Sequence, residues 1–304
     1  MQAVWMILSS FVFATMGVCV KYASAHFNSA ELVFYRGVIG VIFIAAYARA
    51  RGISLATQFP AMHAWRSAVG VMSLSAWFYA IAHLPLATAM TLNYMSSVWI
   101  AAFLVGGSLM FSKAGQKGPS QGPLVMAIMA SFAGVVLLLR PAMDQNQTFA
   151  GLIGLLSGLG AAFAYMQVMA ISRMGEPESR TVFYFAVGTV VAGSVGMLVT
   201  GVSPWSWQHA LWLPPLGILA SLGQLTMTKA YAMSMSSPGH HGGTLMVANL
   251  QYSGIVFAAL YSLILFGDEI PLLGWAGMAL IILSAIAATA LRARAAPNAP
   301  AEEH

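Results

Sequence analysis

The chain alternates long apolar runs with short polar breaks. A continuous run such as Val4–Val20 has no charged residue, and Ser253–Phe266 with its upstream extension behaves in the same way. About 20 apolar residues are what a helix needs to cross the hydrocarbon core of a bilayer. On that measure the pattern predicts ten membrane-spanning helices, at 3–22, 30–48, 65–83, 87–109, 123–140, 151–172, 182–200, 213–233, 243–266 and 273–291.

The composition excludes an ordinary water-soluble domain. Of 304 residues, 59% are apolar and 7% are charged, and the mean hydropathy is +0.79, whereas soluble domains carry roughly 25% charged residues. A backbone in lipid must satisfy its hydrogen bonds within a helix or a closed barrel. Barrel strands alternate apolar and polar residues, and these runs do not. The predicted fold class is therefore an all-α integral membrane protein.

The basic residues predict the orientation. Lysine and arginine are enriched in cytoplasmic connections, and ten of them fall on one side of the predicted topology against two on the other, Lys21 and Arg140. We therefore expect a multi-pass protein of the bacterial inner membrane with both termini in the cytoplasm. The ten are Arg49, Arg51, Arg66, Lys113, Lys117, Arg173, Arg180, Lys229, Arg292 and Arg294. Because they form no patch, the net charge of +5 does not indicate nucleic acid as a partner.

The two halves of the chain, 1–141 and 151–291, look like copies of each other. Short matches recur in the same order at offsets of 149 to 153 residues: Phe13-Ala14-Thr15 with Phe163-Ala164-Tyr165, Val33-Phe34-Tyr35 with Val182-Phe183-Tyr184, Tyr79-Ala80 with Tyr231-Ala232, and Pro85 with Pro238. Five helices per half is an odd number, so the second copy must be inverted in the membrane. Inverted repeats are typical of secondary transporters, with the site between the repeats. The tail 292–304 is expected to be disordered and cytoplasmic.

These features resemble the drug/metabolite transporter superfamily, specifically EamA-type proteins with ten helices in two repeats. The residues that carry the resemblance are Phe34-Tyr35-Arg36, the segment 134–141 (GVVLLLRP), the segment 151–157 (GLIGLLS) and Phe266-Gly267-Asp268-Glu269. The resemblance implies transport of a small metabolite such as an amino acid, a vitamin or a nucleotide-like compound, with no cofactor. One departure is that no acidic residue follows the fourth helix, where the chain reads Phe111-Ser112-Lys113.

Polar side chains deep in the predicted spans are the candidate substrate-binding residues. Such side chains are costly in lipid unless they face a cavity or another helix. Asn93 and Asn249 lie about two turns inside opposite ends of the fourth and ninth helices, at mirrored depths. Each either contacts the substrate or forms an interhelical hydrogen bond, which is worth on the order of 0.6–2 kcal/mol. The other candidates are Tyr94, Ser97, Trp77, Tyr79, Tyr165, Gln224 and Tyr252. Trp77 and Tyr79 lie on different faces of one helix, so at most one should line the path.

Arg36 is the charge placed deepest in a predicted span. It either extends its charge to the outer interface, or forms a structural or gating ion pair with Glu31 or Glu269, or contacts an anionic substrate group; of these we favour the ion pair. No carboxylate is predicted near the bilayer centre, which disfavours proton coupling through a buried acid.

The remaining function classes fit less well. His83, His240 and His241 lie in predicted turns without metal-ligand spacing, so no metal site is expected. The clustered aspartates of a lipid-head transferase and the Gly-x-Ser-Gly turn of an intramembrane protease are both missing, which argues against an enzyme. A channel-like facilitator is the nearer alternative. The expected partners are a small-molecule substrate and the lipid bilayer, and a homodimer is left open.

Overall fold

The computed structural model describes residues 2–100, 102–103, 122–144, 147–235 and 250–295. This part of the chain is helical and contains no strand. Its helices are α1 Gln2–Ala23, α2 Ser29–Ala50, α3 Pro60–His83, α4 Leu86–Tyr94, α6 Gly122–Asp144, α7 Thr148–Arg173, α8 Glu178–Thr200, α9 Trp207–Ala210, α10 Leu213–Met235, α12 Ser253–Leu265 and α13 Leu272–Ala295. Five of them, α1, α2, α7, α8 and the stretch Trp207–Met233, are long and apolar enough to cross a membrane.

Most helix ends fall within a few residues of the predicted ones, and two differences matter. Helix α3 begins at Pro60 rather than at 65, because its first turns carry polar residues that are buried against other helices. Helix α13 continues to Ala295, so 292–295 belong to a helix rather than to the disordered tail predicted for 292–304. Alanine, leucine and arginine are strong helix formers. The rest of that tail lies outside the described residues.

The fourth predicted helix is interrupted near its middle. Helix α4 ends at Tyr94, a turn follows at Met95, and helical residues resume at 96–100. At the break, backbone N–H groups of Met95 and Val98 bond to the carbonyl three residues earlier instead of four. The ninth predicted helix has a similar turn at Gln251–Tyr252 before α12. Its earlier part, with 236–249, lies outside the described residues.

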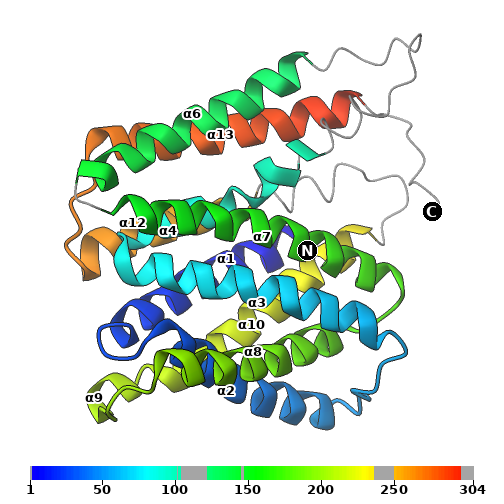
Figure 1. The fold of residues 1–304 in the computed structure, drawn as a ribbon. Helices are drawn as coiled ribbons and strands as arrows, with labels where there is room; N and C mark the ends of the chain where they lie inside the picture. Colours follow the sequence, from blue (N-terminus) through cyan, green and yellow to red (C-terminus); the bar gives the residue numbers. More distant parts are fainter. Residues whose placement is uncertain (1, 101, 104–121, 145–146, 236–249, 296–304) are drawn as a thin grey trace.

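Helices of the two predicted halves pair with one another throughout the molecule. Helix α1 packs on α10, α2 on α8, α3 on α7, α4 on α12 and α6 on α13. Figure 1 shows the α6–α13 pair at the top of the molecule and the α2–α8 pair at the bottom. Close approach requires glycine in both pairs. A Cβ at Gly193 would meet the Phe34 backbone at 2.6 Å, and one at Gly277 would meet the Gly134 carbonyl at 2.7 Å. Glycine at the contact point lets two helix backbones approach closely, as in many membrane bundles.

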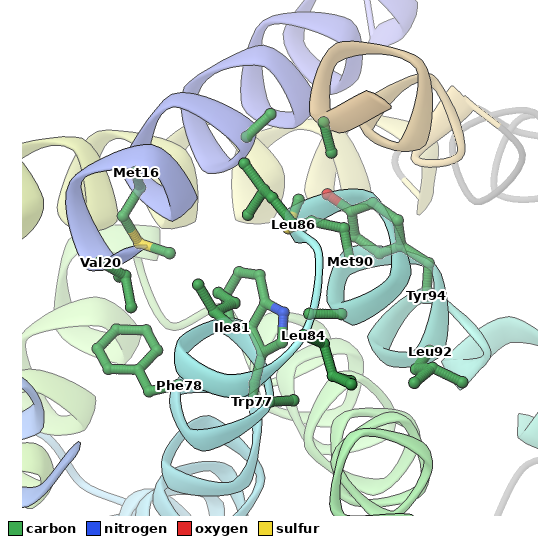
Figure 2. Close-up of a cluster of buried hydrophobic side chains, with 14 of the residues drawn as sticks. Met16, Val20, Trp77, Phe78, Ile81, Leu84, Leu86, Met90, Leu92 and Tyr94 are labelled. Atoms are coloured by element: carbon green, nitrogen blue, oxygen red, sulfur yellow. The ribbon is translucent and has the colours of Figure 1, made fainter. Parts of the chain in front are cut away.

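A cluster of buried, mostly apolar side chains lies where α1, α3 and α4 meet. In Figure 2, side chains from these three helices face one another and fill the space between the helices: Met16, Val20, Trp77, Phe78, Ile81, Leu86 and Met90. Phe78, Ile81, Leu86 and Met90 are completely buried. By contrast, Val195, Leu198 and Val199 of α8 point outward and are exposed. The apolar outer surface of α8 is what a lipid-facing helix requires.

Candidate functional site

A cavity of about 50 Å³ lies between helices from both halves. Its walls come from α1, α2, α3 and α4 on one side and from α7, α8 and α10 on the other. This is the volume open to the centre of a water-sized sphere. One water molecule needs about 10–15 Å³ of such volume, so the cavity has room for a few waters. Its lining consists of Phe13, Met16, Arg36, Arg66, Gly70, Ser73, Leu74, Trp77, Asn93, Tyr94, Ala161, Ala164, Tyr165, Phe185, Gln224 and Met227.

Two arginines enter this cavity from neighbouring helices. Arg36 of α2 is 4% exposed and Arg66 of α3 is 3% exposed. Both guanidinium groups lie against one aromatic ring, with their central carbons 5.0 Å and 4.2 Å from the centroid of Phe185. Nε of Arg36, and Nε and Nη1 of Arg66, have no hydrogen-bond partner. None of the described residues that line the cavity is acidic.

Two unpaired buried cations are expensive. Removing one charge from water costs several kcal/mol even after the protein relaxes. A cation–π contact returns only about 0.5–2 kcal/mol, and the two charges repel each other. Cavity water can solvate them in part, but an oppositely charged group would stabilise them far more. The cavity is therefore electrostatically complementary to an anion.

Gly70 makes room for one of these guanidinium groups. It lies four residues after Arg66, one turn along α3, and a Cβ at Gly70 would overlap Nη1 of Arg66 and come within 2.9 Å of the Phe185 ring. Neighbours at this spacing share a helix face. The Arg66 guanidinium can take this position because residue 70 is glycine and has no Cβ.

Several other lining residues present hydrogen-bond donors. The indole Nε1 of Trp77 and the hydroxyl of Tyr94 are buried without a partner. Asn93 lines the cavity and also donates from Nδ2 to Oγ of Ser157 on α7, at 3.1 Å. Tyr165 accepts a hydrogen bond from Nε2 of Gln251 at 3.1 Å. Gln224 completes the set of predicted residues that line the cavity.

Three predicted candidates lie elsewhere. Tyr79 stacks on His83, with ring centroids 4.1 Å apart, near the end of α3 and away from the cavity lining. Ser97 follows the turn at Met95, and Tyr252 lies in the turn before α12 with its hydroxyl buried. These two residues adjoin the cavity wall formed by Tyr94, whose ring contacts Gly254. Asn249 lies outside the described residues.

The predicted ion pair of Arg36 with Glu31 is wrong. Glu31 accepts hydrogen bonds from the backbone N–H of Asn28 and Ser203 and from the Ser203 hydroxyl, at 2.7–3.0 Å. It forms the capping box that begins α2. Arg36 lies five positions after Glu31 in the same helix, so the two side chains point in different directions. Glu269 is exposed after α12 and forms no ion pair with Arg36.

Sequence reasoning missed Arg66 because it assigned this residue to a cytoplasmic connection. The signal was present in the spacing. His63, Arg66, Gly70, Ser73 and Trp77 recur every three or four residues, which is one face of a helix. A polar stripe that continues into an apolar helix indicates a face directed at other helices rather than at lipid. Phe185 carried no comparable signal.

One polar network closes the end of the bundle where α3 and α8 begin. Glu176 accepts hydrogen bonds from Thr57 at 3.0 Å and Arg180 at 3.3 Å, and lies 3.5 Å from His63. Burial alone would raise the pKa of the Glu176 carboxyl, but the hydrogen bonds from Thr57 and Arg180 and the Arg180 charge bring that pKa below its usual value. Arg180 also donates to the Ser54 carbonyl. This network ties the 51–59 connection to α8.

A second network lies at the other end of the bundle. Lys21 of α1 donates to the Leu84 carbonyl at 2.6 Å and lies 4.0 Å from the Asp268 carboxylate. Ser262 donates to the same carboxylate at 2.6 Å. These contacts join α1, the α3–α4 turn and the segment after α12.

No group of three or more His, Cys, Asp or Glu side chains in the described part of the chain could hold a metal ion. The chemistry available in the cavity is binding, through arginine, indole, phenol and amide groups.

Comparisons with known proteins point to transport. No protein-family model matches the chain. The pseudopaline exporter CntI of Pseudomonas aeruginosa is 32% identical over 282 residues, covering 92% of this chain and 93% of its own. A riboflavin transporter of Vibrio cholerae is 25% identical over 298 residues, covering 93% and 90%. One crystal structure of a protein matches the fold with a TM-score of 0.62 at 18% identity, over 96% of this chain and 98% of that one.

Proposed function

The chain belongs to the family of membrane transporters that includes the pseudopaline exporter of Pseudomonas aeruginosa, and we propose that it carries a small polar or amphipathic metabolite across the bacterial inner membrane by alternating access. It is a multi-pass membrane protein. The observation that carries the proposal is a small cavity that contains two arginines and is lined by helices of both halves. A membrane protein has little other reason to bury two unpaired cations.

The helix pairing supports two related halves of the EamA type. If α1, α2, α3, α4 and α6 are matched in order with α7, α8, α10, α12 and α13, exchanging the halves leaves the pairing unchanged. The α1–α10 contact becomes α7–α3, and the α2–α8, α4–α12 and α6–α13 contacts become themselves. A pseudo-two-fold axis relates inverted repeats in secondary transporters. In this proposal the chain has ten spans, 1–141 and 151–291 being the two repeats.

The interrupted helices support a site at the interface of the repeats. The turns at Met95 and at Gln251–Tyr252 lie in the fourth helix of each proposed repeat, and Tyr94 contacts Gly254 next to them. Secondary transporters often form their sites from such discontinuous helices near the midplane. Tyr94 lines the cavity, so the break and the cavity adjoin.

The size of the cavity favours a carrier over a channel-like facilitator. A space for a few water molecules cannot hold a metabolite until the helices separate. The Glu176 and Lys21 networks, at opposite ends, are the contacts that we propose to open in turn, one to each side of the membrane.

The charge distribution supports cytoplasmic termini. With Arg66 assigned to the cavity, nine basic residues remain on the proposed cytoplasmic side against two outside. The start of α1 and the end of α13 both lie toward the right of Figure 1.

Flux through purified protein in proteoliposomes tests the proposal. Pseudopaline and riboflavin, after which two relatives are named as transporters, are the first compounds to examine, followed by amino acids and vitamins. A carrier gives saturable uptake that is accelerated by unlabelled substrate on the opposite side, whereas a channel gives no such acceleration. Formation of a chemically altered product would indicate an enzyme and contradict the proposal.

A further inference from the structure

We propose that the transported compound is a small organic oxyanion, bearing a carboxylate or phosphate group, and that Arg36 and Arg66 bind this group against Phe185. The inference rests on the proposed function, since it assigns the substrate class of the same cavity. It starts from two buried guanidinium groups that have unpartnered N–H groups and belong to residues lining one small space.

None of the described residues that line the cavity gives these arginines a counter-charge. Three of the described carboxylates are engaged elsewhere: Glu31 caps α2 and accepts from Ser203, Glu176 binds Thr57 and Arg180, and Asp268 accepts from Ser262. Glu178 and Glu269 lie outside the cavity lining. The described walls therefore supply positive charge with nothing to neutralise it, and an incoming anion supplies what is missing.

The hydrogen-bonding groups select an acceptor. Guanidinium and indole groups can only donate. Nε of Arg36, Nε and Nη1 of Arg66, Nε1 of Trp77 and the Tyr94 hydroxyl have no hydrogen-bond partner. A carboxylate or phosphate offers several acceptor oxygens in the geometry that the arginine fork matches. A compound without acceptor oxygens would leave these donors unsatisfied, and a neutral or cationic compound would leave the positive charge of the two arginines uncompensated.

The rest of the cavity is apolar. Phe13, Met16, Leu74 and Met227 line it beside the charged end, and Phe13 approaches Trp77 edge to face at 6.4 Å. Apolar walls next to a charged group suit an amphipathic compound. The preferred class is therefore an organic anion with an apolar or aromatic part rather than an inorganic ion.

Thermal unfolding of the purified full-length protein in detergent tests binding directly. The probes are benzoate and phenyl phosphate, with benzamide as the neutral match for benzoate and inorganic phosphate as the match for phenyl phosphate. At about 10 mM, a ligand of millimolar affinity raises the melting temperature measurably. We expect benzoate or phenyl phosphate to stabilise the wild type and benzamide not to do so. The two organic anions separate the carboxylate class from the phosphate class.

Substitutions then assign the effect to the arginines. Arg36→Gln and Arg66→Gln should each abolish the shift caused by the anion, whereas Arg51→Gln, an exposed arginine at the end of α2, should retain it. Without ligand, the melting temperatures of the two cavity variants should equal or exceed that of the wild type, because each removes an unpaired buried charge. An arginine held in a structural ion pair would give the opposite result, a lower melting temperature.

Three results would overturn the inference. One is an equal melting-temperature shift with benzoate and benzamide, and another is no shift with any of the anions. The third is a shift by the anions that persists in Arg36→Gln and Arg66→Gln. The vesicle assay separates it from the proposed function. If the anions bind but show no flux, transport is contradicted, whereas the inference that the cavity binds an organic oxyanion is still supported. Saturable flux of a neutral compound, with an unchanged KM in Arg36→Gln and Arg66→Gln, would contradict the oxyanion substrate class but would still support transport.

Discussion

At the scale of single residues, Gly70 and Arg66 show how a small residue positions a charge. A glycine inside a helix costs about 0.5–1 kcal/mol relative to alanine. Gly70 is retained in α3 at a point where any Cβ would overlap the Arg66 guanidinium. The space lets that charge lie along its own helix against Phe185. The low helix propensity of Gly70 is thus offset by the room that it leaves for the Arg66 guanidinium in the cavity.

Gly70→Ala should therefore impair the site without unfolding the protein. Displacing the Arg66 guanidinium should raise the KM of the transported compound at least about tenfold, which corresponds to roughly 1.4 kcal/mol. Flux in proteoliposomes measures the change. Ala68→Ser, on the exposed side of the same helix, is the control. A normal KM in Gly70→Ala would show that the arrangement of Arg66 against Gly70 does not matter for binding.

Asn93→Ala separates a substrate contact from an interhelical hydrogen bond. The loss of the bond to Ser157 should lower stability by about 0.6–2 kcal/mol. If Asn93 also contacts the substrate, the KM rises as well, which is the result we expect because Asn93 lines the cavity. Tyr79→Phe, outside the lining, should leave flux unchanged. A reduced melting temperature with normal flux in Asn93→Ala would assign this residue to helix packing alone.

At the scale of helices, the beginning of α8 is held to the rest of the bundle by the Glu176 network. His63, Arg180 and Thr57 face the Glu176 carboxylate, and Tyr184 of α8 stacks on His63 with centroids 4.7 Å apart. Tyr184 also donates to the Leu55 carbonyl. One carboxylate therefore joins α3, α8 and the connection between α2 and α3. In the proposed transport cycle, opening that end of the bundle requires these contacts to separate.

Glu176→Gln should destabilise the protein in a pH-dependent way. Because folding lowers the pKa of this carboxyl, its stabilising effect is present above the unfolded pKa of about 4.3 and disappears as the pH falls through the folded value. At pH 7 we expect a loss of about 1–3 kcal/mol, typical of hydrogen bonds to a charged group. Thermal unfolding in detergent at pH 7 and below pH 4 should show the difference shrinking with acid. A pH-independent difference would contradict the lowered pKa, and Glu178→Gln is the matched control.

At the scale of the whole molecule, contacts between the halves organise the protein. Each described long helix finds a main partner in the other half, and the cavity lies where α2, α3 and α8 converge with α7 and α10. In Figure 1 the helices run roughly along one direction, so the two ends of the bundle face opposite sides. The Glu176 and Lys21 networks lie at these two ends. This arrangement supports access to the cavity from either side in turn.

Cysteine labelling tests the orientation. Cys19 is the only native cysteine and is buried, so Cys19→Ser provides the background. Arg51→Cys should react with an impermeant maleimide only from the cytoplasmic side, and Val202→Cys, which is 62% exposed, only from outside. Tags on both termini should be accessible from the cytoplasm. Labelling of both cysteines from one side would contradict the predicted topology and the inverted repeats.

Within the described residues, the sequence alone predicted most helices and their approximate ends, since each depends on local features: runs of apolar residues and breaks rich in glycine and proline. It also predicted Asn93, Tyr94, Trp77, Tyr165 and Gln224, which line the cavity, because polar and aromatic groups inside apolar helices stand out from their surroundings. It placed Arg36 in a span but favoured an ion pair with Glu31 or Glu269, and Arg36 forms neither pair in the structure.

Only the tertiary structure decided what surrounds each of these side chains. Arg36, Arg66 and Phe185 are separated by at least 30 residues of sequence and meet because α2, α3 and α8 pack together. Glu31 is close to Arg36 in sequence, yet it is engaged by Asn28 and by Ser203 from the distant second half. The charge balance of the cavity depends on such long-range contacts, which a local pattern of residues does not contain.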